Sequence, residues 1–299
     1  MNSLKNRSKE YLGTRPKVAL MVNDKQACNL RCTCCYLSYE GVRDPDEVFR
    51  IVENLRSEYR VVIVGSEILT DLGYLKSLQL AGQKYVLTNG ILLARNPNLY
   101  DTLKEYGIEE IQVSLNFREQ KEKSGITEVL LPKVIQEAKE RGFFVRVTCM
   151  ISAETYENVE EMCDIVKSMG ADAVHFTRYI KSGGARGEDT MVVNQEQKKR
   201  FFQLVDEARK KYPKEELEIR VNGNFGPKKG SKGEELSEQN RYCPAGKNAF
   251  VVAPDNTVYG CPYLMDASPI GELIEESRLK ITNDLCNGNR CQCLTDLLC

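Results

Sequence analysis

The sequence predicts an α/β protein: a partial (β/α)6 barrel of the TIM type, followed by a small cysteine-rich α+β unit. Three observations support this fold class. Short β-branched runs alternate six times with amphipathic helical patterns, as parallel strands and their crossover helices do. Twelve cysteines gather mainly near the two ends of the 299-residue chain. A stretch rich in glycine and lysine, residues 222–240, precedes the last cysteines and is typical of a linker or lid.

The pattern places each βα unit along the chain. Strands are expected where β-branched and aromatic residues cluster, at 17–22, 60–65, 84–90, 108–116, 143–152 and 171–180. Helices are expected where apolar residues recur at helical spacing, at 46–59, 72–82, 97–107, 126–142, 156–170 and 195–212. The chain then divides into an N-terminal extension (1–16), the barrel (17–221), the linker or lid (222–240) and the C-terminal unit (241–299). In such a barrel, the chemistry gathers at the carboxyl ends of the strands.

Composition and charge exclude several classes of protein. The 42 basic and 43 acidic residues give a net charge of -1, so no global field holds a nucleic acid or an anionic membrane. A hydrophobic fraction of 41% is enough for a substantial core and excludes a mainly disordered chain. The sequence contains no run of 18 apolar residues and no signal-peptide pattern. We therefore expect a cytoplasmic protein without a membrane span.

The cysteine count indicates metal binding. Twelve cysteines are too many for a reducing compartment unless they bind metal, and a single histidine, His175, leaves thiolates as the main ligands. Cys28, Cys32 and Cys35 form a C-x3-C-x2-C motif directly after the first predicted strand. Three thiolates cannot close a four-iron cluster, so one iron would be open to a small molecule. A zinc knot, or cysteines packed as small apolar residues, is the alternative.

A strand, a C-x3-C-x2-C loop and a sixfold βα pattern, in this order, resemble the radical S-adenosylmethionine (SAM) superfamily. The resemblance implies a 4Fe-4S cluster whose open iron chelates the amino and carboxylate groups of SAM. It also implies reductive cleavage of SAM to a 5′-deoxyadenosyl radical that abstracts a hydrogen atom. An electron donor of the flavodoxin or ferredoxin type is then an expected partner.

The same resemblance assigns residues to SAM binding. Gly65, Ser66 and Glu67 occupy the place of the family's Gly-Gly-Glu turn, whose backbone pairs with the methionine amino group; Ser66 replaces the second glycine. The usual aromatic position before the third ligand holds Cys34, so the adenine contact passes to Tyr36. Cys34 itself is expected to be an inert thiol, a spare ligand or a hydrogen donor. The further assignments are Ser114 and Asn116 for the SAM carboxylate and ribose, and Arg178 near the bound SAM.

The second group of cysteines follows the linker. Cys243 and Cys261 bracket two strand-like runs with a turn at 254–256, and a helix is expected at 268–277. This order resembles the SPASM or twitch extension of radical SAM enzymes, which carries auxiliary iron-sulfur clusters. We expect at least one auxiliary cluster, bound by Cys243, Cys261 and two of the remaining four cysteines, Cys286, Cys291, Cys293 and Cys299. Two clusters or a zinc ribbon are the alternatives, because six cysteines stand where the full pattern has seven.

Alternation along the last two predicted strands selects residues that face the barrel interior. Arg146 and Thr148 point inward if the apolar side of their strand, which includes Cys149, faces the helices. His175 and Tyr179 alternate with apolar residues in the next strand and also face inward. These four are the candidates for substrate contact, although a lone histidine is more often structural.

The expected function is abstraction of a hydrogen atom from a peptide, with net oxidation by crosslink formation or dehydrogenation. A dehydrogenase or epimerase of an aminosugar or cyclitol is the alternative, because a barrel that begins near residue 17 leaves no room for an N-terminal peptide-recognition domain. A zinc-binding, cysteine-rich adaptor is the alternative from another class. The substrate is therefore expected to be a peptide or a small polar molecule, with neither nucleic acid nor membrane as a partner.

Overall fold

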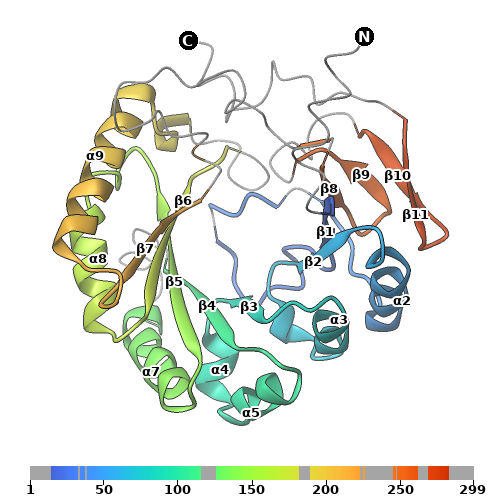
Figure 1. Ribbon diagram of the computed structural model, residues 1–299, viewed down its shortest axis with the longest axis horizontal. Helices are drawn as coiled ribbons and strands as arrows, with labels where there is room; N and C mark the ends of the chain where they lie inside the picture. Colours follow the sequence, from blue (N-terminus) through green and yellow to red (C-terminus); the bar gives the residue numbers. More distant parts are fainter. Residues whose placement is uncertain are drawn as a thin grey trace.

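The computed structural model describes residues 15–32, 34–37, 39–115, 126–181, 189–222, 225, 245–246, 248–261 and 269–282. Its strands form two sheets that line the inside of an open arc, and helices cover the outside (Figure 1). The first sheet has the order β11-β10-β9-β8-β1-β2, and the second has the order β3-β4-β5-β6-β7. The sheet does not close. The α/β class and the partial barrel predicted from the sequence are confirmed.

The six predicted βα units are present, whereas α4 and the seventh barrel strand, β7, were not predicted. The barrel strands are β1 (Lys17–Met21), β2 (Arg60–Val64), β3 (Tyr85–Thr88), β4 (Glu110–Leu115), β5 (Phe144–Ile151), β6 (Ala173–Arg178) and β7 (Glu218–Val221). The helices are α2 (Pro45–Leu55), α3 (Tyr74–Leu80), α4 (Ile91–Arg95), α5 (Asn98–Glu105), α7 (Ile126–Glu140), α8 (Val159–Ser168) and α9 (Gln195–Lys211), with short 3-10 turns η1 (Ile68–Thr70) and η3 (Asp189–Met191). All barrel strands that pair with one another run parallel.

The arc is interrupted between β2 and β3, which belong to different sheets. The buried side chain of Gln83 spans this interruption. Its Oε1 accepts from the Ile63 backbone N–H at 2.8 Å, and its Nε2 donates to the Ile63 carbonyl at 3.2 Å. Because the side-chain amide supplies both bonds that a neighbouring strand would supply, β2 keeps its backbone paired without a continuous ladder.

The core lies between the sheets and the outer helices. Val145, Val147 and Cys149 of β5 are 0% exposed and belong to the main hydrophobic cluster, while Thr148 on the opposite face is half-buried. The alternation predicted for this strand therefore holds, and Cys149 faces the helices. Figure 1 shows α7, α8 and α9 on the outer side of these strands.

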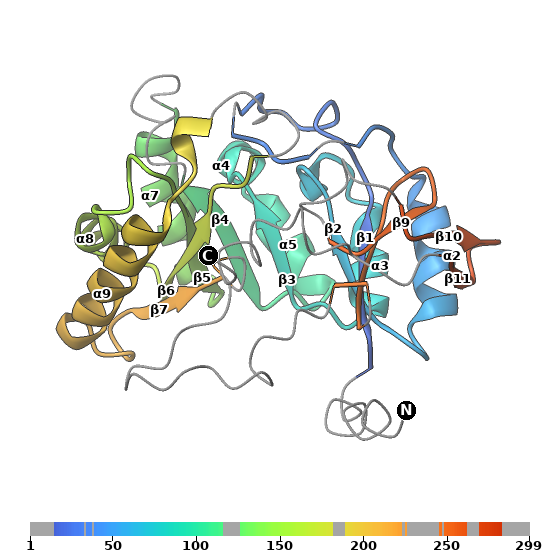
Figure 2. The ribbon, with the colours of Figure 1, turned by 90° about the horizontal axis from the view of Figure 1, so that it is seen from above.

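The C-terminal strands extend the first sheet of the barrel. They are β8 (Ala249–Val252), β9 (Thr257–Tyr259), β10 (Gly271–Ile274) and β11 (Arg278–Ile281). The predicted hairpin is present as the antiparallel β8–β9 pair, and β8 also pairs in parallel with β1. Figure 2 shows these strands beside β1 and α2, as Figure 1 does. The domain boundaries given above stay predictions, but this pairing joins the two cysteine-bearing parts of the chain in one sheet.

The helix expected at 268–277 is wrong. This segment forms β10 and the turn into β11, with which β10 pairs in antiparallel register. Glu275 and Glu276 take φ values of 49° and 55°, which end a helix but suit a tight turn. A Cβ on Gly271 would lie 2.2 Å from the carbonyl oxygen of Lys280, so the close strand approach requires glycine there. A short apolar run cannot distinguish the two structures without its strand partner. None of the helices in the described ranges is long and apolar enough to cross a membrane.

Candidate cofactor site at the rim of the barrel

Three loops meet where β1, β2 and β3 end. We define the cysteine loop as residues 25–41, between β1 and α2; it carries Cys28, Cys32, Cys34 and Cys35. The turn 65–67 follows β2, and the turn 88–90 follows β3. Since these strands all run in the same direction, their loops emerge at the same edge. The structure thus brings two predicted SAM-site segments, the cysteine loop and the turn 65–67, together with the turn 88–90.

The three predicted cluster ligands are half-buried on the cysteine loop. The Cys28 sulfur accepts from the Leu30 backbone N–H at 3.4 Å, and the Cys35 N–H donates to the Cys32 carbonyl at 3.3 Å. Burial raises the pKa of Cys28, and the charges of Glu67 and Cys35 act in the same direction. Across the ranges that the structure describes, no three or more His, Cys, Asp or Glu side chains are arranged to hold a metal ion.

The donor chemistry of the loop nevertheless fits an iron-sulfur cluster. Soft thiolates at partial exposure are the ligands that such clusters use. Cys28 and Cys35 lie within electrostatic reach of each other. Cys28, Cys32 and Cys35 are therefore the residues that would hold the cluster, which remains a prediction for each of them.

Glu67 connects the ends of β2 and β3. Its side chain is 0% exposed and accepts from the Leu69 N–H at 3.3 Å, the Thr88 hydroxyl at 3.1 Å and the Asn89 N–H at 2.8 Å. Burial raises its pKa, against the effect of these three donors. The Asn89 amide in turn donates to the Asn29 side chain at 2.7 Å. The Thr-Asn-Gly turn is thereby tied both to Glu67 and to the cysteine loop.

The other predicted SAM contacts are only partly described. Ser114 is half-buried on the inner face of β4, whereas Asn116 lies outside the described residues. Arg178 is 3% exposed, and its register position places it on the face of Val174 and Phe176, which belong to the core. Burial raises the pKa of Tyr36 to about 12, with contributions from Cys35 and Cys261. The roles of all four in SAM binding stay predictions.

A row of polar side chains lines the inner face of β4, β5 and β6. The strand register sets Ser114, Thr148 and His175 side by side. Arg146 lies nearer the start of β5, is 7% exposed and pairs with Glu110 at 2.8 Å. Burial lowers the pKa of His175 to about 4, and the guanidinium groups of Arg146 and Arg220 add to this effect. His175 is therefore neutral at pH 7, when it can both donate and accept a hydrogen bond.

Tyr179 and Cys34 belong to one small cluster. Tyr179 is 1% exposed and packs with Met191, and Cys34 and Met150 pack against this pair. Strand β6 ends at Arg178. The strand alternation from which an inward-facing Tyr179 was predicted therefore does not extend to this residue. Through this hydrophobic contact, the cysteine loop packs against the end of the second sheet, across the arc from β1.

Of the second group of cysteines, the structure describes Cys261, which is half-buried directly after β9. Its charge contributes to the raised pKa of Tyr36, so it lies near the cysteine loop. The other predicted ligands of an auxiliary cluster lie outside the described residues: Cys243, Cys286, Cys291, Cys293 and Cys299.

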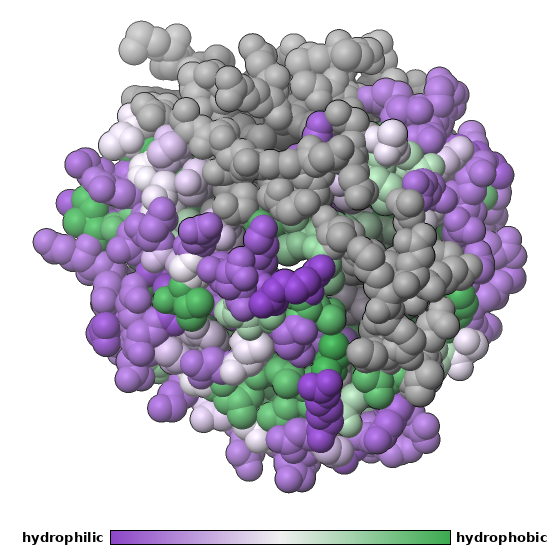
Figure 3. Space-filling view, turned by 180° about the vertical axis from the view of Figure 1, so that it is seen from behind, coloured by the Kyte–Doolittle hydropathy of each residue, from purple (hydrophilic) through white to green (hydrophobic). Residues whose placement is uncertain are grey.

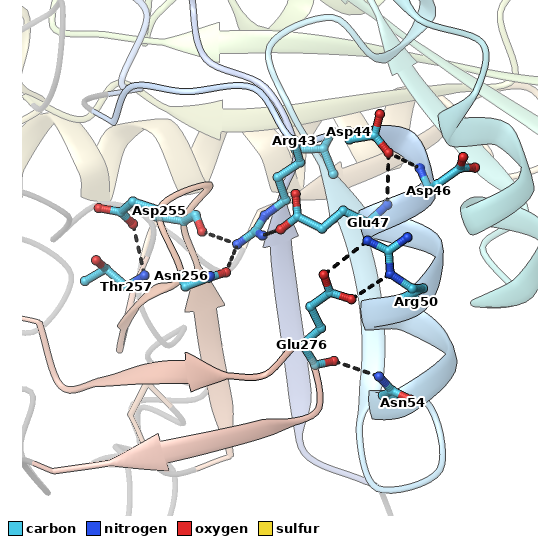
Figure 4. A network of polar contacts seen from close by, with 12 residues as sticks. Arg43, Asp44, Asp46, Glu47, Arg50, Asn54, Asp255, Asn256, Thr257 and Glu276 are labelled. Atoms are coloured by element: carbon cyan, nitrogen blue, oxygen red, sulfur yellow. Dashed lines mark hydrogen bonds and ion pairs between the residues drawn. The ribbon is translucent and has the colours of Figure 1, made fainter.

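A buried arginine just before α2 links that helix to the β8–β9 hairpin. Arg43 pairs with Glu47, and its Nη2 donates to the Ala253 carbonyl at 2.5 Å and to Asn256 Oδ1 at 2.8 Å. Figure 4 shows this network beside the exposed pair of Arg50 and Glu276.

Figure 3 shows the opposite side of the molecule from Figure 1, where hydrophilic residues cover most of the described surface.

Asn23 and Asp24 were not selected from the sequence, although they lie between β1 and the cysteine loop and bond to both rim segments. An Asn-Asp pair at a strand end was an available signal, because Asx side chains accept from nearby backbone N–H groups in turns. Glu110 on β4, which pairs with Arg146, carried no comparable signal.

Residues 22–169 match the model of the radical SAM superfamily. This segment of the chain is similar to radical SAM domains. The matched segment runs from the end of β1 through α8 and includes the cysteine loop and the turns at 65–67 and 88–90. Among curated protein sequences, none matches the chain significantly.

Two proteins with the same fold, SuiB and anSMEcpe, have structures solved with SAM or a peptide bound. SuiB of Streptococcus suis bound to the precursor peptide SuiA has a TM-score of 0.66 and 16% identity, and the match covers 88% of this chain and 64% of SuiB. SuiB bound to SAM has a TM-score of 0.66 and 16% identity, with 86% and 63% covered. The protein anSMEcpe bound to SAM and the Cp18Cys peptide has a TM-score of 0.60 and 17% identity, and the match covers 86% of this chain and 77% of anSMEcpe. The chain spans less than two thirds of the length of SuiB, and identities this low establish the fold alone.

Proposed function

We propose that this chain is a radical SAM enzyme that abstracts a hydrogen atom from a peptide and leaves it oxidised. The observation that carries the proposal is the meeting of the cysteine loop with the turns at 65–67 and 88–90, joined through Glu67 and Asn89. A cluster held there by Cys28, Cys32 and Cys35 would supply one electron to bound SAM, which breaks the bond between sulfur and the 5′ carbon and gives methionine and a 5′-deoxyadenosyl radical. The electron comes from a flavodoxin- or ferredoxin-type donor, and the enzyme works in the cytoplasm.

The residues of the chain then have separate roles. Cys28, Cys32 and Cys35 hold the cluster, and the backbone of the 65–67 turn binds the methionine amino group. Ser114, Asn116, Tyr36 and Arg178 contact the rest of SAM. The polar row on β4, β5 and β6 orients the substrate, and a neutral His175 can accept a hydrogen bond from a peptide N–H. SuiB and anSMEcpe, which share the fold, have been solved with peptides bound, which supports a peptide substrate.

The proposal includes an auxiliary cluster in a SPASM- or twitch-like unit formed by residues 241–299. Cys261 near Tyr36 supports it, because a second cluster there would lie close to the SAM site. We therefore expect about eight irons per chain after anaerobic reconstitution, falling to about four when Cys28, Cys32 and Cys35 are all replaced by alanine. Iron and zinc analysis measures this. About twelve irons, or zinc in the C-terminal unit, would contradict a single auxiliary cluster, and a colourless zinc protein that tolerates air would support the adaptor.

The reaction is proposed to be a net oxidation. The substrate would give one hydrogen atom to the 5′-deoxyadenosyl radical, and the remaining electron and proton would then leave it. The C-terminal cysteines, Cys261 among them, would hold the auxiliary cluster, which would supply an acceptor for that electron, and the proton would pass to solvent. Quenching by a thiol would need one that faces the barrel interior. Cys149 faces the helices at 0% exposure, which leaves Cys34 or a C-terminal cysteine as the candidate donors. The product formed in heavy water should lack two hydrogens relative to the substrate, as measured by mass spectrometry. Unchanged composition with one deuterium on carbon would contradict oxidation and indicate epimerisation with a cysteine donor.

The polar inner face favours one second candidate, a dehydrogenase or epimerase of an aminosugar or cyclitol. Ser114, Thr148 and His175 side by side could hydrogen-bond to the hydroxyl groups of such a molecule as well as to a peptide. Turnover with short peptides, compared with turnover of aminosugars and cyclitols, separates the two substrate classes.

A further inference from the structure

Asn23 and Asp24 form a buried polar pair between β1 and the cysteine loop. They are 1% and 6% exposed. A buried polar side chain is costly unless it is hydrogen-bonded, and both of these have several bonds. The partners show what the pair holds in place.

Asp24 fastens both ends of the cysteine loop. Its Oδ1 accepts from the backbone N–H groups of Gln26 at 2.7 Å and Ala27 at 3.1 Å, where the loop begins. Its Oδ2 accepts from the Gly41 N–H at 2.8 Å, where the loop ends. One carboxylate thus closes the loop that carries all three predicted cluster ligands, through charge-assisted bonds.

Asn23 fastens the turn at 65–67. Its Oδ1 accepts from the Ser66 N–H at 2.8 Å, and its Nδ2 donates to the Glu67 carbonyl at 3.1 Å. A Cβ on Gly65 would lie 2.1 Å from this same Oδ1. Glycine is therefore required at position 65 to leave room for the Asn23 side chain. The Ser66 hydroxyl adds a bond to the Asp24 carbonyl at 2.6 Å.

We propose that Asn23 and Asp24 are positioning residues that fix the cysteine loop relative to the turn at 65–67. The inference rests on the proposed function, in which the loop holds the cluster and the turn binds the amino group of SAM. Both segments bond to the same two neighbouring residues, so these residues would set the spacing between the loop that holds the cluster and the turn that binds SAM. An ordinary turn cap bonds only to its own turn, whereas these bonds span 17 residues to Gly41 and 43 to Ser66.

The test replaces Asp24 by asparagine. The amide keeps one oxygen for Gln26 and Ala27 but turns its NH2 group toward the Gly41 N–H, so that the loop end loses its acceptor. In the iron-free protein, hydrogen exchange at the loop amides near Gly41 should become about tenfold faster, as expected for loss of one charge-assisted bond. Exchange in β4 and β5 should not change.

Asp44→Asn is the matched control. Asp44 also accepts from two backbone N–H groups, those of Asp46 and Glu47, but at the start of α2 and not in the cysteine loop. Asparagine is as good a helix cap as aspartate, so exchange in the loop should remain as in the wild type. This variant shows whether a general loss of charge or stability is responsible.

The reconstituted protein gives a second readout. Asp24→Asn should retain iron, yet the change that SAM causes in the electron paramagnetic resonance spectrum of the reduced cluster should weaken, and the KM for SAM should rise about tenfold. Asn23→Asp, which keeps the acceptor for Ser66 but loses the donor to Glu67, should show the same spectral effect.

Two results would overturn the inference in different ways. If the wild type binds iron and SAM but Asp24→Asn matches it in loop exchange and in its spectrum, the positioning role is wrong and the proposed function stands. If the wild type binds no iron, the proposed function is refuted and the cofactor role of the pair is refuted with it.

Discussion

Cys32→Ala is expected to abolish reductive cleavage of SAM. Two thiolates, Cys28 and Cys35, cannot hold a four-iron cluster with a single open iron, so both the SAM ligand site and the route for the electron are lost. The measurement is the formation of 5′-deoxyadenosine by anaerobically reconstituted protein with a low-potential reductant. We expect the variant to give no product above the level without protein.

The control for this experiment is Cys163→Ala. Cys163 is 0% exposed in the core on α8, and burial raises its pKa to about 12, so it is an inert packed thiol. Iron content and SAM cleavage should stay as in the wild type. Unchanged cleavage in Cys32→Ala would show that the C-x3-C-x2-C motif does not hold the catalytic cluster.

Arg43→Ala is expected to lower the free energy of unfolding by about 3 kcal/mol, because truncating one member of a buried, hydrogen-bonded charge pair leaves its partners unsatisfied. The side chain of Arg43 is 0% exposed, and its removal would leave Glu47, the Ala253 carbonyl and Asn256 without this donor. Anaerobic urea unfolding measures the change.

Arg50→Ala is the matched control. Arg50 also joins α2 to a C-terminal hairpin, through Glu276, but its side chain is 54% exposed. Solvent and salt screen such a pair, so its loss should change stability far less. Equal effects of the two substitutions would contradict the view that burial makes the Arg43 contacts more stabilising than the exposed Arg50–Glu276 pair.

The site was predictable where chemistry depends on residue type and local spacing. Cys28, Cys32 and Cys35 on one loop after a strand indicate a thiolate site without any tertiary information, and the period of two along β5 placed Cys149 against the helices. The loop partners were not predictable in the same way. Glu67 bonds to Thr88 and Asn89 only because β2 and β3 end at the same rim. Such contacts between separate strand ends cannot be deduced from the sequence pattern.

The C-terminal part shows the same division. The hairpin of β8 and β9 follows from its local pattern, with Asn256 at φ 71° in the turn. The strand in the segment 268–277 does not follow from its local pattern, because it forms only by pairing with β9 and β11.

By itself, the sequence determined the α/β alternation, the cysteine spacing and the face that β5 and β6 bury, because these depend on periodicity and on short-range chain geometry. Only the tertiary structure decided that β8 pairs with β1 and brings Cys261 toward the cysteine loop, that Arg43 is enclosed between α2 and a hairpin more than 200 residues away, and that Asn23 and Asp24 join two loops. The physical reason is that hydrogen-bond partners distant in the chain are selected by which buried groups would otherwise be left unsatisfied once the core has formed.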